Sequence, residues 1–204
     1  MDFYEVINNR RTERDWSDKP VSEEAIDRII NAGLAAPSNN HMRQWEFIVL
    51  HTEEEKAIGL QYVKKWAEKQ GENMNIGHAT PAQKMYAYAM PRQFSMLNDA
   101  PYVMIPLFKA GAGLFHAASV SSLNSFASIW CVIENIFLAA TAEGMACSMR
   151  IPVGTEGPDV CKALGVPEGY MMPVYIGTGY PAENAEELEQ NTFTAEQKIH
   201  RGKW

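Results

Sequence analysis

The longest stretch of this chain without a formal charge runs over residues 110–133 and leads into a further apolar segment. It is long enough to cross a bilayer. It also contains two glycines, His116, Asn124 and five serines, and so many polar groups are costly in lipid. We therefore predict a loop that enters a buried helix over residues 126–142, broken only by an adjacent Glu-Asn pair. A helix that is apolar nearly all round belongs inside a packed core.

The composition indicates one globular domain over residues 1–204. Of the 204 residues, 46% are hydrophobic and 21% are charged, and a chain of this length can bury most of the surface that its unfolded state exposes. No repeat, low-complexity tract or linker divides the sequence. The net charge of −7, from 18 basic and 25 acidic residues, disfavours nucleic acid and membrane surfaces as partners.

The cysteines and histidines indicate neither a disulfide framework nor a metal site. The three cysteines form no C-x-x-C motif, and the five histidines show no ligand spacing. We therefore predict no metal. The acidic start of the sequence, residues 1–5, reaches no apolar run before two arginines, so we predict no signal peptide and a cytoplasmic protein.

Helices and strands are predicted from caps, periodicity and β-branched content. Asp2 and Ser22 are candidate N-caps, apolar residues at helical spacing follow each of them, and the second helix ends before Pro37. Residues 53–69 have helical character, whereas residues 71–96 have no clear period and indicate a helix-containing excursion over a pocket. Buried strands are predicted over residues 45–50, 101–108 and 174–177.

Two clusters of basic side chains lie near the two ends of the sequence. The first, at a helix-to-loop junction, combines a hydroxyl with three guanidinium groups: Arg10, Arg11, Thr12 and Arg14. Arginine suits phosphate because it donates two parallel charge-assisted hydrogen bonds. The alternative is that these arginines pair with neighbouring acidic residues such as Asp15 and Asp18. The second cluster, Lys198, Arg201 and Lys203, could meet the first around one anion.

Several other positions could serve either function or structure. The loop 38–40 offers donors and acceptors, either to the polar edge of a heterocycle or to its own backbone. The small residues of segment 144–152 would let the backbone approach a flat ligand closely. Glu134 would need a partner if the helix around it is buried, and Cys147 is either a packing residue or a reactive thiol. The sequence has neither a G-x-S-x-G elbow nor a dinucleotide-binding glycine motif, which disfavours a serine hydrolase and a Rossmann fold.

Taken in order, several segments resemble the nitroreductase family of FMN-dependent oxidoreductases. The family's R-R-S-x-R start is similar to residues 10–14, and its A-P-S-x-x-N-x-Q-P-W-x-F loop is similar to residues 35–47. The D-A-P that opens its next strand is found at residues 99–101. Its central helix and its closing G-Y-P strand resemble residues 133–144 and 175–181. The order and spacing of these segments make the resemblance specific.

The resemblance implies an α+β fold in which helices flank a central mixed β-sheet, and an intertwined homodimer with two FMN sites at its interface. The basic residues that it assigns to the FMN phosphate and ribityl chain are Arg10, Arg11 and Arg14, with Arg201 or Lys203. It places Thr12 at the polar edge of the flavin ring and Gln93 against the flavin. The residues that it assigns to the other subunit are Pro37, Ser38, Asn39 and Asn40.

Three departures from the family pattern affect the expected site. Thr12 replaces a serine but keeps the hydroxyl. Residues 42–44 change the spacing of the N-x-Q-P-W signature and lose its proline. The family usually donates a backbone N–H to flavin N5 from the turn at residues 149–153, where Pro152 has none to give. Ile151 is therefore the candidate donor, with Pro152 beside it at the flavin.

The activity that the resemblance implies is a ping-pong hydride transfer. NAD(P)H reduces FMN and leaves, and a nitroaromatic, quinone or other electron-poor small molecule then takes the electrons. The candidate residues for the acceptor slot are Met90, Phe94, Phe115 and Phe126. The alternatives are a specialised relative, such as a reductive dehalogenase or a flavin-destroying enzyme, and a non-catalytic FMN-binding protein.

Overall fold

The computed structural model describes residues 1–70, 77–110 and 114–204, except for the side chain of Phe115. The sheet order is β1-β2-β5-β3, with β4 paired to β2. The strands are β1 (Trp45–Leu50), β2 (Tyr102–Lys109), β3 (Ala146–Arg150), β4 (Tyr170–Met171) and β5 (Tyr175–Gly179). All pairings between these strands are antiparallel. The parallel component of the expected mixed sheet is confined, among the described residues, to an isolated bridge between Thr12 and Cys147.

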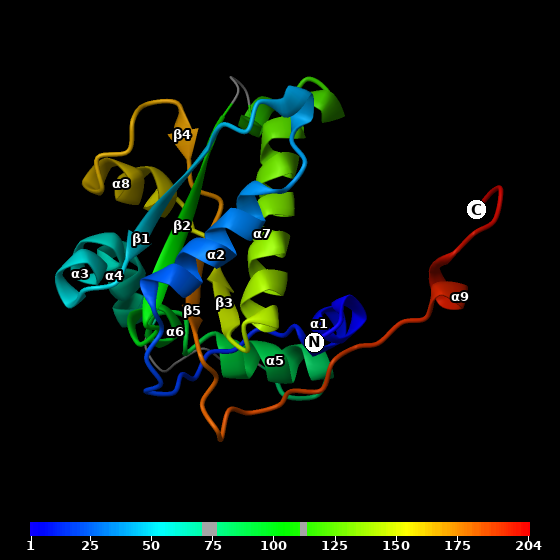
Figure 1. Ribbon diagram of the computed structural model, residues 1–204, viewed down its shortest axis with the longest axis horizontal. Coiled ribbons are helices and arrows are strands. Elements are labelled where there is room, and N and C mark those ends of the chain that lie inside the picture. The colour runs from blue at the N-terminus through cyan, green and yellow to red at the C-terminus, as the bar shows by residue number, and fades with distance from the viewer. Residues whose placement is uncertain (71–76, 111–113) are drawn as a thin grey trace.

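Helices cover both faces of this sheet (Figure 1). The long helices are α2 (Glu23–Leu34), α4 (Gln61–Gln70), α5 (Pro81–Ala89) and α7 (Asn124–Ala142). The shorter helices are α1 (Phe3–Asn9), α3 (Glu53–Gly59), α6 (Ser95–Asn98), α8 (Glu156–Ala163) and α9 (Ala195–Lys198). The predicted caps are confirmed, because the side chains of Asp2 and Ser22 accept hydrogen bonds from the first turns of α1 and α2.

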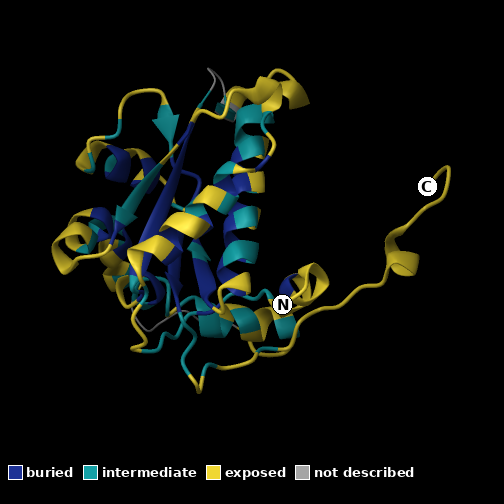
Figure 2. Ribbon diagram, in the orientation of Figure 1, coloured by how far each residue is buried: buried dark blue, intermediate teal, exposed yellow. Residues whose placement is uncertain are grey.

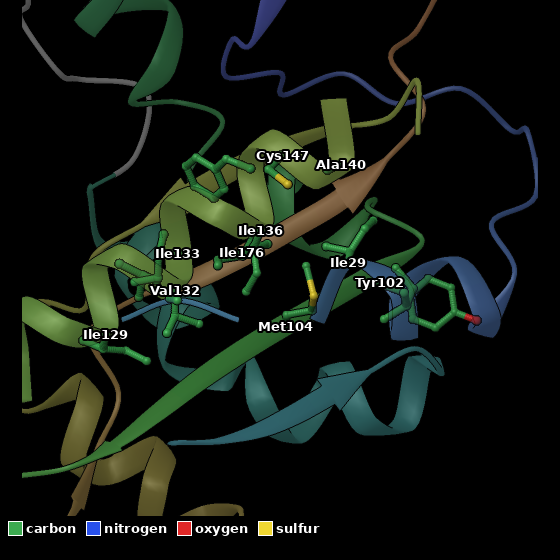
Figure 3. Packing of buried hydrophobic residues seen from close by; sticks show 14 of the residues in the cluster. Ile29, Tyr102, Met104, Ile129, Val132, Ile133, Ile136, Ala140, Cys147 and Ile176 are labelled. Carbon is green, nitrogen blue, oxygen red and sulfur yellow. The ribbon is translucent and has the colours of Figure 1, made fainter. Parts of the chain in front are cut away.

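The alternating side chains of β2 divide the core into two clusters. Met104 and Phe108 face a cluster built with α2 and α7, and Figure 3 shows Met104 in this cluster together with Ile133. Val103 and Ile105 face a second cluster, built with α3, α4 and α8. Successive side chains in a strand point to opposite faces, so a single strand anchors both layers.

The apolar helix that the sequence predicts is α7, and it is a core helix. Residues 120–142, which contain α7, form the one helical stretch of the described chain that is long and apolar enough to cross a membrane. Helix α7 packs against α2, β2 and β3. One side of α7 is exposed along Ala127, Cys131, Glu134 and Ala142, so the described part of this chain does not cover that side. The exposed Glu134 lies on α7, and the expectation of a buried carboxylate there is wrong.

Two other predictions from sequence needed correction. The helical segment 53–69 is divided at Leu60 into α3 and α4. The sequence predicted no strand in the small-residue segment after α7, yet this segment contains β3, which pairs with β5 along its whole length. Tertiary pairing with β5 overrides the weak strand propensity of Ala146 and Ser148.

The segment after β5 leaves the body of the molecule. Residues 183–204, here called the tail, first pass α5, where Gln190 contacts Met85, and then extend away from the body with the short helix α9 near their end (Figure 1). Nearly all of the tail is exposed (Figure 2). Its large apolar side chains are uncovered too, with Trp204 97% exposed and Phe193 and Ile199 also exposed. Such an apolar segment outside the core is typical of an interaction surface.

Candidate functional site

The first basic cluster lies on a segment that runs between β3 and the chain after β5. Thr12 forms the bridge with Cys147, and the N–H of Glu13 donates to the Cys147 carbonyl over 3.1 Å. Further along, the N–H of Ser17 donates to the Tyr180 carbonyl over 3.0 Å. Backbone hydrogen bonds hold both ends of the segment, and the sheet therefore fixes the orientation of its side chains.

Arg11 is occupied within the chain. It forms an ion pair with Glu13, which is only 3% exposed, and its other side reaches Glu187 of the tail over 2.7 Å. A buried carboxylate is costly unless a cation and hydrogen bonds compensate it. For Arg11, pairing with neighbouring glutamates is thus the arrangement observed.

Arg10 and Arg14 form no ion pair with any residue that the structure describes. The Nε of Arg14 is buried without a hydrogen-bond partner, and its guanidinium lies 5.9 Å from the centre of the Tyr88 ring. Burial lowers the pKa of Arg14 from its usual value, which is the signature of a cation without sufficient compensation. These two arginines can still receive an anion.

Asp15 forms no ion pair with Arg14 and has other partners. The Tyr88 hydroxyl donates to Asp15, and Arg92 lies 3.5 Å from the same carboxylate. Burial, helped by this hydrogen bond, raises the pKa of Tyr88 to about 12, so the phenol remains a proton donor at neutral pH. Sequence reasoning missed Tyr88 and Arg92. Their i, i+4 spacing was the available signal, since it stacks Arg92 on the Tyr88 ring at 3.9 Å.

The turn after β3 offers unclaimed backbone donors. The N–H groups of Ile151, Val153 and Gly154 make no hydrogen bond with any described residue, and Pro152 has no N–H. Ile151 and Val153 are both exposed. Exposed apolar side chains beside free N–H groups suit the edge of a flat, largely apolar ligand that carries a hydrogen-bond acceptor. Cys147, one strand length away, is buried, and burial raises the pKa of its thiol to about 12; it is a packing residue.

The loop from Ser38 to Arg43 is held in a strained shape. The backbone angle φ is positive, between 44° and 52°, at Asn40, His41 and Arg43. Residues other than glycine adopt such angles at an energetic cost. The loop is tied to the start of α7, because the Asn39 N–H donates to Ser128 Oγ over 3.1 Å. Strain of this kind is found most often where backbone shape serves binding.

A cavity of about 370 Å³ lies between this loop and the start of α7. Trp45 and Phe108 contribute apolar surface to it, and several serines contribute hydroxyls. Arg43 and Lys109 also line it, and neither forms an ion pair with a described residue. The volume suits a small aromatic molecule, and the two cations would favour one that carries a negative group.

The structure brings some of the predicted site residues together and separates others. The loop 37–40 lies at the start of α7, whereas the first basic cluster lies near its end, where Arg11 and Thr141 line one cavity. The 19 residues of α7 span about 28 Å. One chain therefore does not unite the loop with the cluster. Arg201 and Lys203 follow α9 in the tail, whose end extends away from the sheet (Figure 1).

The proposed slot residues are dispersed as well. Phe126 packs beside Phe108 and Trp130 in the cluster of α2 and α7. Phe94 packs against the opposite cluster, so these two rings do not face each other within one chain. Met90 is half-buried at the end of α5, and Gln93 donates its side-chain amide to the Ala89 carbonyl over 3.1 Å. The side chain of Phe115 lies outside the described part of the structure.

Metal ligands do not cluster in the described part of the chain, where no group of three or more histidine, cysteine, aspartate or glutamate side chains could hold an ion. The site is thus defined by two free arginines at one end of β3 and by free N–H groups at the other. Such an arrangement at the edge strand β3 of an α+β fold suits an anionic, flat-ringed ligand.

The sequence profile of the nitroreductase family matches residues 7–180, and the chain belongs to this family. A protein from Methanothermobacter thermautotrophicus, named as an NADH dehydrogenase/NAD(P)H nitroreductase, is 28% identical over 100% of this chain and 88% of its own length. Iodotyrosine deiodinase 1 from Rattus norvegicus is 28% identical over 95% of this chain and 67% of its own length.

Solved structures share the fold. An FMN- and NADPH-dependent nitroreductase from a Sphingopyxis strain has a TM-score of 0.74 at 16% identity, and each chain covers 100% of the other. An iodotyrosine deiodinase bound to FMN and 3-iodo-L-tyrosine has a TM-score of 0.71 at 16% identity, over 97% of this chain and 100% of the other. These likenesses confirm the predicted nitroreductase-like α+β architecture.

Proposed function

We propose that this protein is an FMN-dependent oxidoreductase that uses NAD(P)H to reduce nitroaromatics, quinones or similar electron-poor acceptors in two successive half-reactions. One observation carries the proposal. Two arginines that form no ion pair with a described residue lie at one end of β3, and a turn whose N–H groups donate to no described residue lies at the other. Family membership and the names of the relatives agree with it. We also propose that the protein acts in the cytoplasm.

The residues present fit FMN at both of its ends. The buried, unpartnered Nε of Arg14 and the free guanidinium of Arg10 suit a phosphate. The free N–H groups of residues 151–154 suit a ring nitrogen that accepts a hydrogen bond. The four residue-to-residue steps from Cys147 to Ile151 advance about 13 Å in an extended chain, which leaves room for a ribityl chain between the two ends.

The site is proposed to be completed by a second copy of this chain. One side of the apolar helix α7 is uncovered, the tail presents exposed apolar residues, and the loop 37–40 lies a helix length away from Arg10 in its own chain. An intertwined homodimer would cover α7, seat the tail on the partner and bring the partner's loop to the flavin. Arg201 and Lys203 would then join the phosphate site, and Met90 and Phe126 would border the acceptor slot.

When bound, FMN would supply the hydride chemistry, which protein side chains cannot perform. The chain itself would bind and orient. Arg10 and Arg14 hold the phosphate, and Asp15 stays with Tyr88 and Arg92, so it leaves the charge of Arg14 available. The turn 151–154 directs its N–H groups at the reacting edge of the ring, and the exposed side chain of Ile151 excludes water there. Thr12 supplies a hydroxyl from the segment beside β3.

Reductive dehalogenation is a second candidate. The cavity beside the strained loop carries two unpaired cations, Arg43 and Lys109, which suit an aromatic acceptor with a carboxylate. The deiodinase among the relatives is bound to 3-iodo-L-tyrosine in its solved structure. A panel of acceptors that includes 3-iodo-L-tyrosine, 4-nitrobenzoate and a neutral quinone distinguishes the two functions, because only a dehalogenase releases iodide.

Anaerobic reduction tests the proposal directly. We expect the purified protein to be yellow or to take up FMN at one per chain, and NADH or NADPH to bleach the flavin before any acceptor is added. Adding a nitroaromatic or quinone should restore the colour, because the two half-reactions are separate. A flavin that neither nucleotide bleaches would show a non-catalytic FMN-binding protein. A chain that takes up no FMN would overturn both readings.

Arg10 and Arg11 are expected to differ in their effect on FMN binding. Arg10→Ala should raise the Kd for FMN about 10- to 100-fold, because a hydrogen bond to a charged group contributes about 1.5–3 kcal/mol. Arg11→Ala should change this Kd much less and should instead lower the midpoint of urea unfolding, since it leaves Glu13 buried without its cation. Fluorescence titration of FMN measures the first effect. A larger loss in Arg11→Ala than in Arg10→Ala would contradict the assignment.

A further inference from the structure

A buried ion pair lies directly beneath the turn that follows β3. Arg150, the last residue of β3, is 2% exposed, and Glu156, the first residue of α8, is 5% exposed. The two side chains pair through both oxygens, with Nη1 to Oε1 at 2.6 Å and Nη2 to Oε2 at 2.9 Å. The pair thus joins the residue before the turn to the residue after it.

The same two residues also hold the backbone of the turn. Arg150 Nη1 donates to the Ile151 carbonyl over 3.2 Å, and the Glu156 N–H donates to the Val153 carbonyl over 3.0 Å. The N–H of a trans peptide group points opposite to its carbonyl, so the bond to the Val153 carbonyl fixes the direction of the Gly154 N–H. The peptide group of the Ile151 carbonyl ends in Pro152, which has no N–H, and the bond to it fixes the backbone just before Val153. The Trp66 ring further restricts the movement of the Arg150 side chain, since the guanidinium lies 5.0 Å from the centre of this ring.

The pair is not explained by stability. Removing two charges from water costs several kcal/mol, and well-packed apolar residues in place of a buried ion pair are often as stable or more so. The pair is also incompletely satisfied, because Arg150 Nε is buried without a hydrogen-bond partner in the described structure. What the pair does provide is a rigid, directional link between β3 and α8.

We propose that Arg150 and Glu156 are positioning residues, whose buried pair fixes the backbone of turn 151–155 and so aims its free N–H groups at the bound flavin. This inference rests on the proposed function. The two side chains touch neither cofactor nor acceptor. They act through the shape of the turn, and thereby set how strongly its N–H dipoles favour the electron-rich, reduced flavin.

The test separates positioning from folding by removing both charges together. In the double variant Arg150→Met/Glu156→Met no charge is left unpaired, so the fold and its Tm should be kept, whereas Arg150→Met alone leaves Glu156 buried and unpaired. A matched control is Arg28→Met/Glu143→Met, which removes an equally bidentate pair, at 2.8 and 2.7 Å, on the exposed surface between α2 and the end of α7.

We expect the Arg150/Glu156 double variant to loosen the turn and to weaken the flavin's tendency to accept electrons. The NMR order parameters of the Val153 and Gly154 N–H groups, measured on the full chain with and without FMN, should fall from rigid to flexible values. The two-electron redox equilibrium of the bound flavin should shift at least tenfold towards the oxidised form, about 30 mV, with the Kd for FMN changed less than about threefold. The control pair should change none of these.

Two outcomes would overturn the inference. Unchanged order parameters in a folded double variant would show that the pair does not fix the turn, whether or not the protein binds FMN. A loosened turn with an unchanged redox equilibrium in the FMN-loaded protein would show that its N–H groups do not act on the flavin. Failure of the proposed function is distinguishable from both, because it shows as absent FMN or absent bleaching in the unsubstituted protein.

Discussion

Removing the tail, residues 183–204, is expected to leave a monomer that no longer retains FMN. The tail carries three exposed large apolar residues and the second basic cluster. Its contacts with the body come from its first part, through Glu187 and Gln190, whereas Phe193, Ile199 and Trp204 remain exposed, as Figure 2 shows for this end of the chain. If the tail seats on a second copy, its loss removes both the interface and two cations from the phosphate. Each such contact is worth about 1.5–3 kcal/mol, so the Kd for FMN should rise at least about 100-fold.

Three variants in the full chain separate the two roles of the tail. Arg201→Ala/Lys203→Ala should keep the dimer and weaken FMN binding. Trp204→Ala should weaken the dimer more than it weakens FMN binding, because it removes the most exposed aromatic ring of the tail. Lys198→Ala is the matched control, since Lys198 lies over the Phe193 ring at 4.0 Å and is already engaged. Light scattering gives the oligomeric state. A truncated chain that stays dimeric and yellow would refute both the dimer and the role of the tail.

Gly177→Ala is expected to lower the free energy of unfolding by about 2–3 kcal/mol, because overpacking a filled core typically costs this much. A Cβ at Gly177 would lie 2.6 Å from Ser148 Oγ and 2.7 Å from the Met96 carbonyl oxygen. Neither atom can move away freely. Ser148 is buried on β3 and donates to that same carbonyl over 3.2 Å, and Met96 belongs to α6, which packs on β5.

Gly157→Ala is the matched control for this substitution. A Cβ at Gly157 would have its nearest neighbour at 3.6 Å, an ordinary contact, and the residue lies in α8, where alanine is favoured by about 1 kcal/mol. This variant should be as stable as the unsubstituted protein or more so. Urea unfolding measures both variants. Equal midpoints for Gly177→Ala and the unsubstituted protein would show that α6 does not press on β5 as closely as the structure indicates.

Much of the fold could be predicted because its signals are local. The caps at Asp2 and Ser22, the apolar period of α2 and the run of apolar residues in α7 act within a few residues of each other. The strand β3 could not be predicted in this way. Its residues have little strand propensity, and it exists because β5 pairs with it from far along the chain.

The candidate site was only partly predictable for the same reason. Arginines at positions 10, 11 and 14 look alike in sequence, and the order of motifs pointed to a flavin phosphate for all three. The structure separates them, because Arg11 meets Glu13 and Glu187 whereas Arg10 and Arg14 find no carboxylate among the described residues. Which arginine remains available depends on the path of the tail, and no local pattern encodes that path.

The sequence by itself thus determined the family, the helices with strong caps, the strands β1, β2 and β5 and the existence of two basic clusters. Only the tertiary structure decided that Glu134 is exposed, that Arg11 is occupied and that a buried Arg150–Glu156 pair lies under the turn 151–155. The physical reason is that capping and periodicity are properties of neighbouring residues, whereas burial and charge pairing depend on which distant segments the folded chain brings into contact.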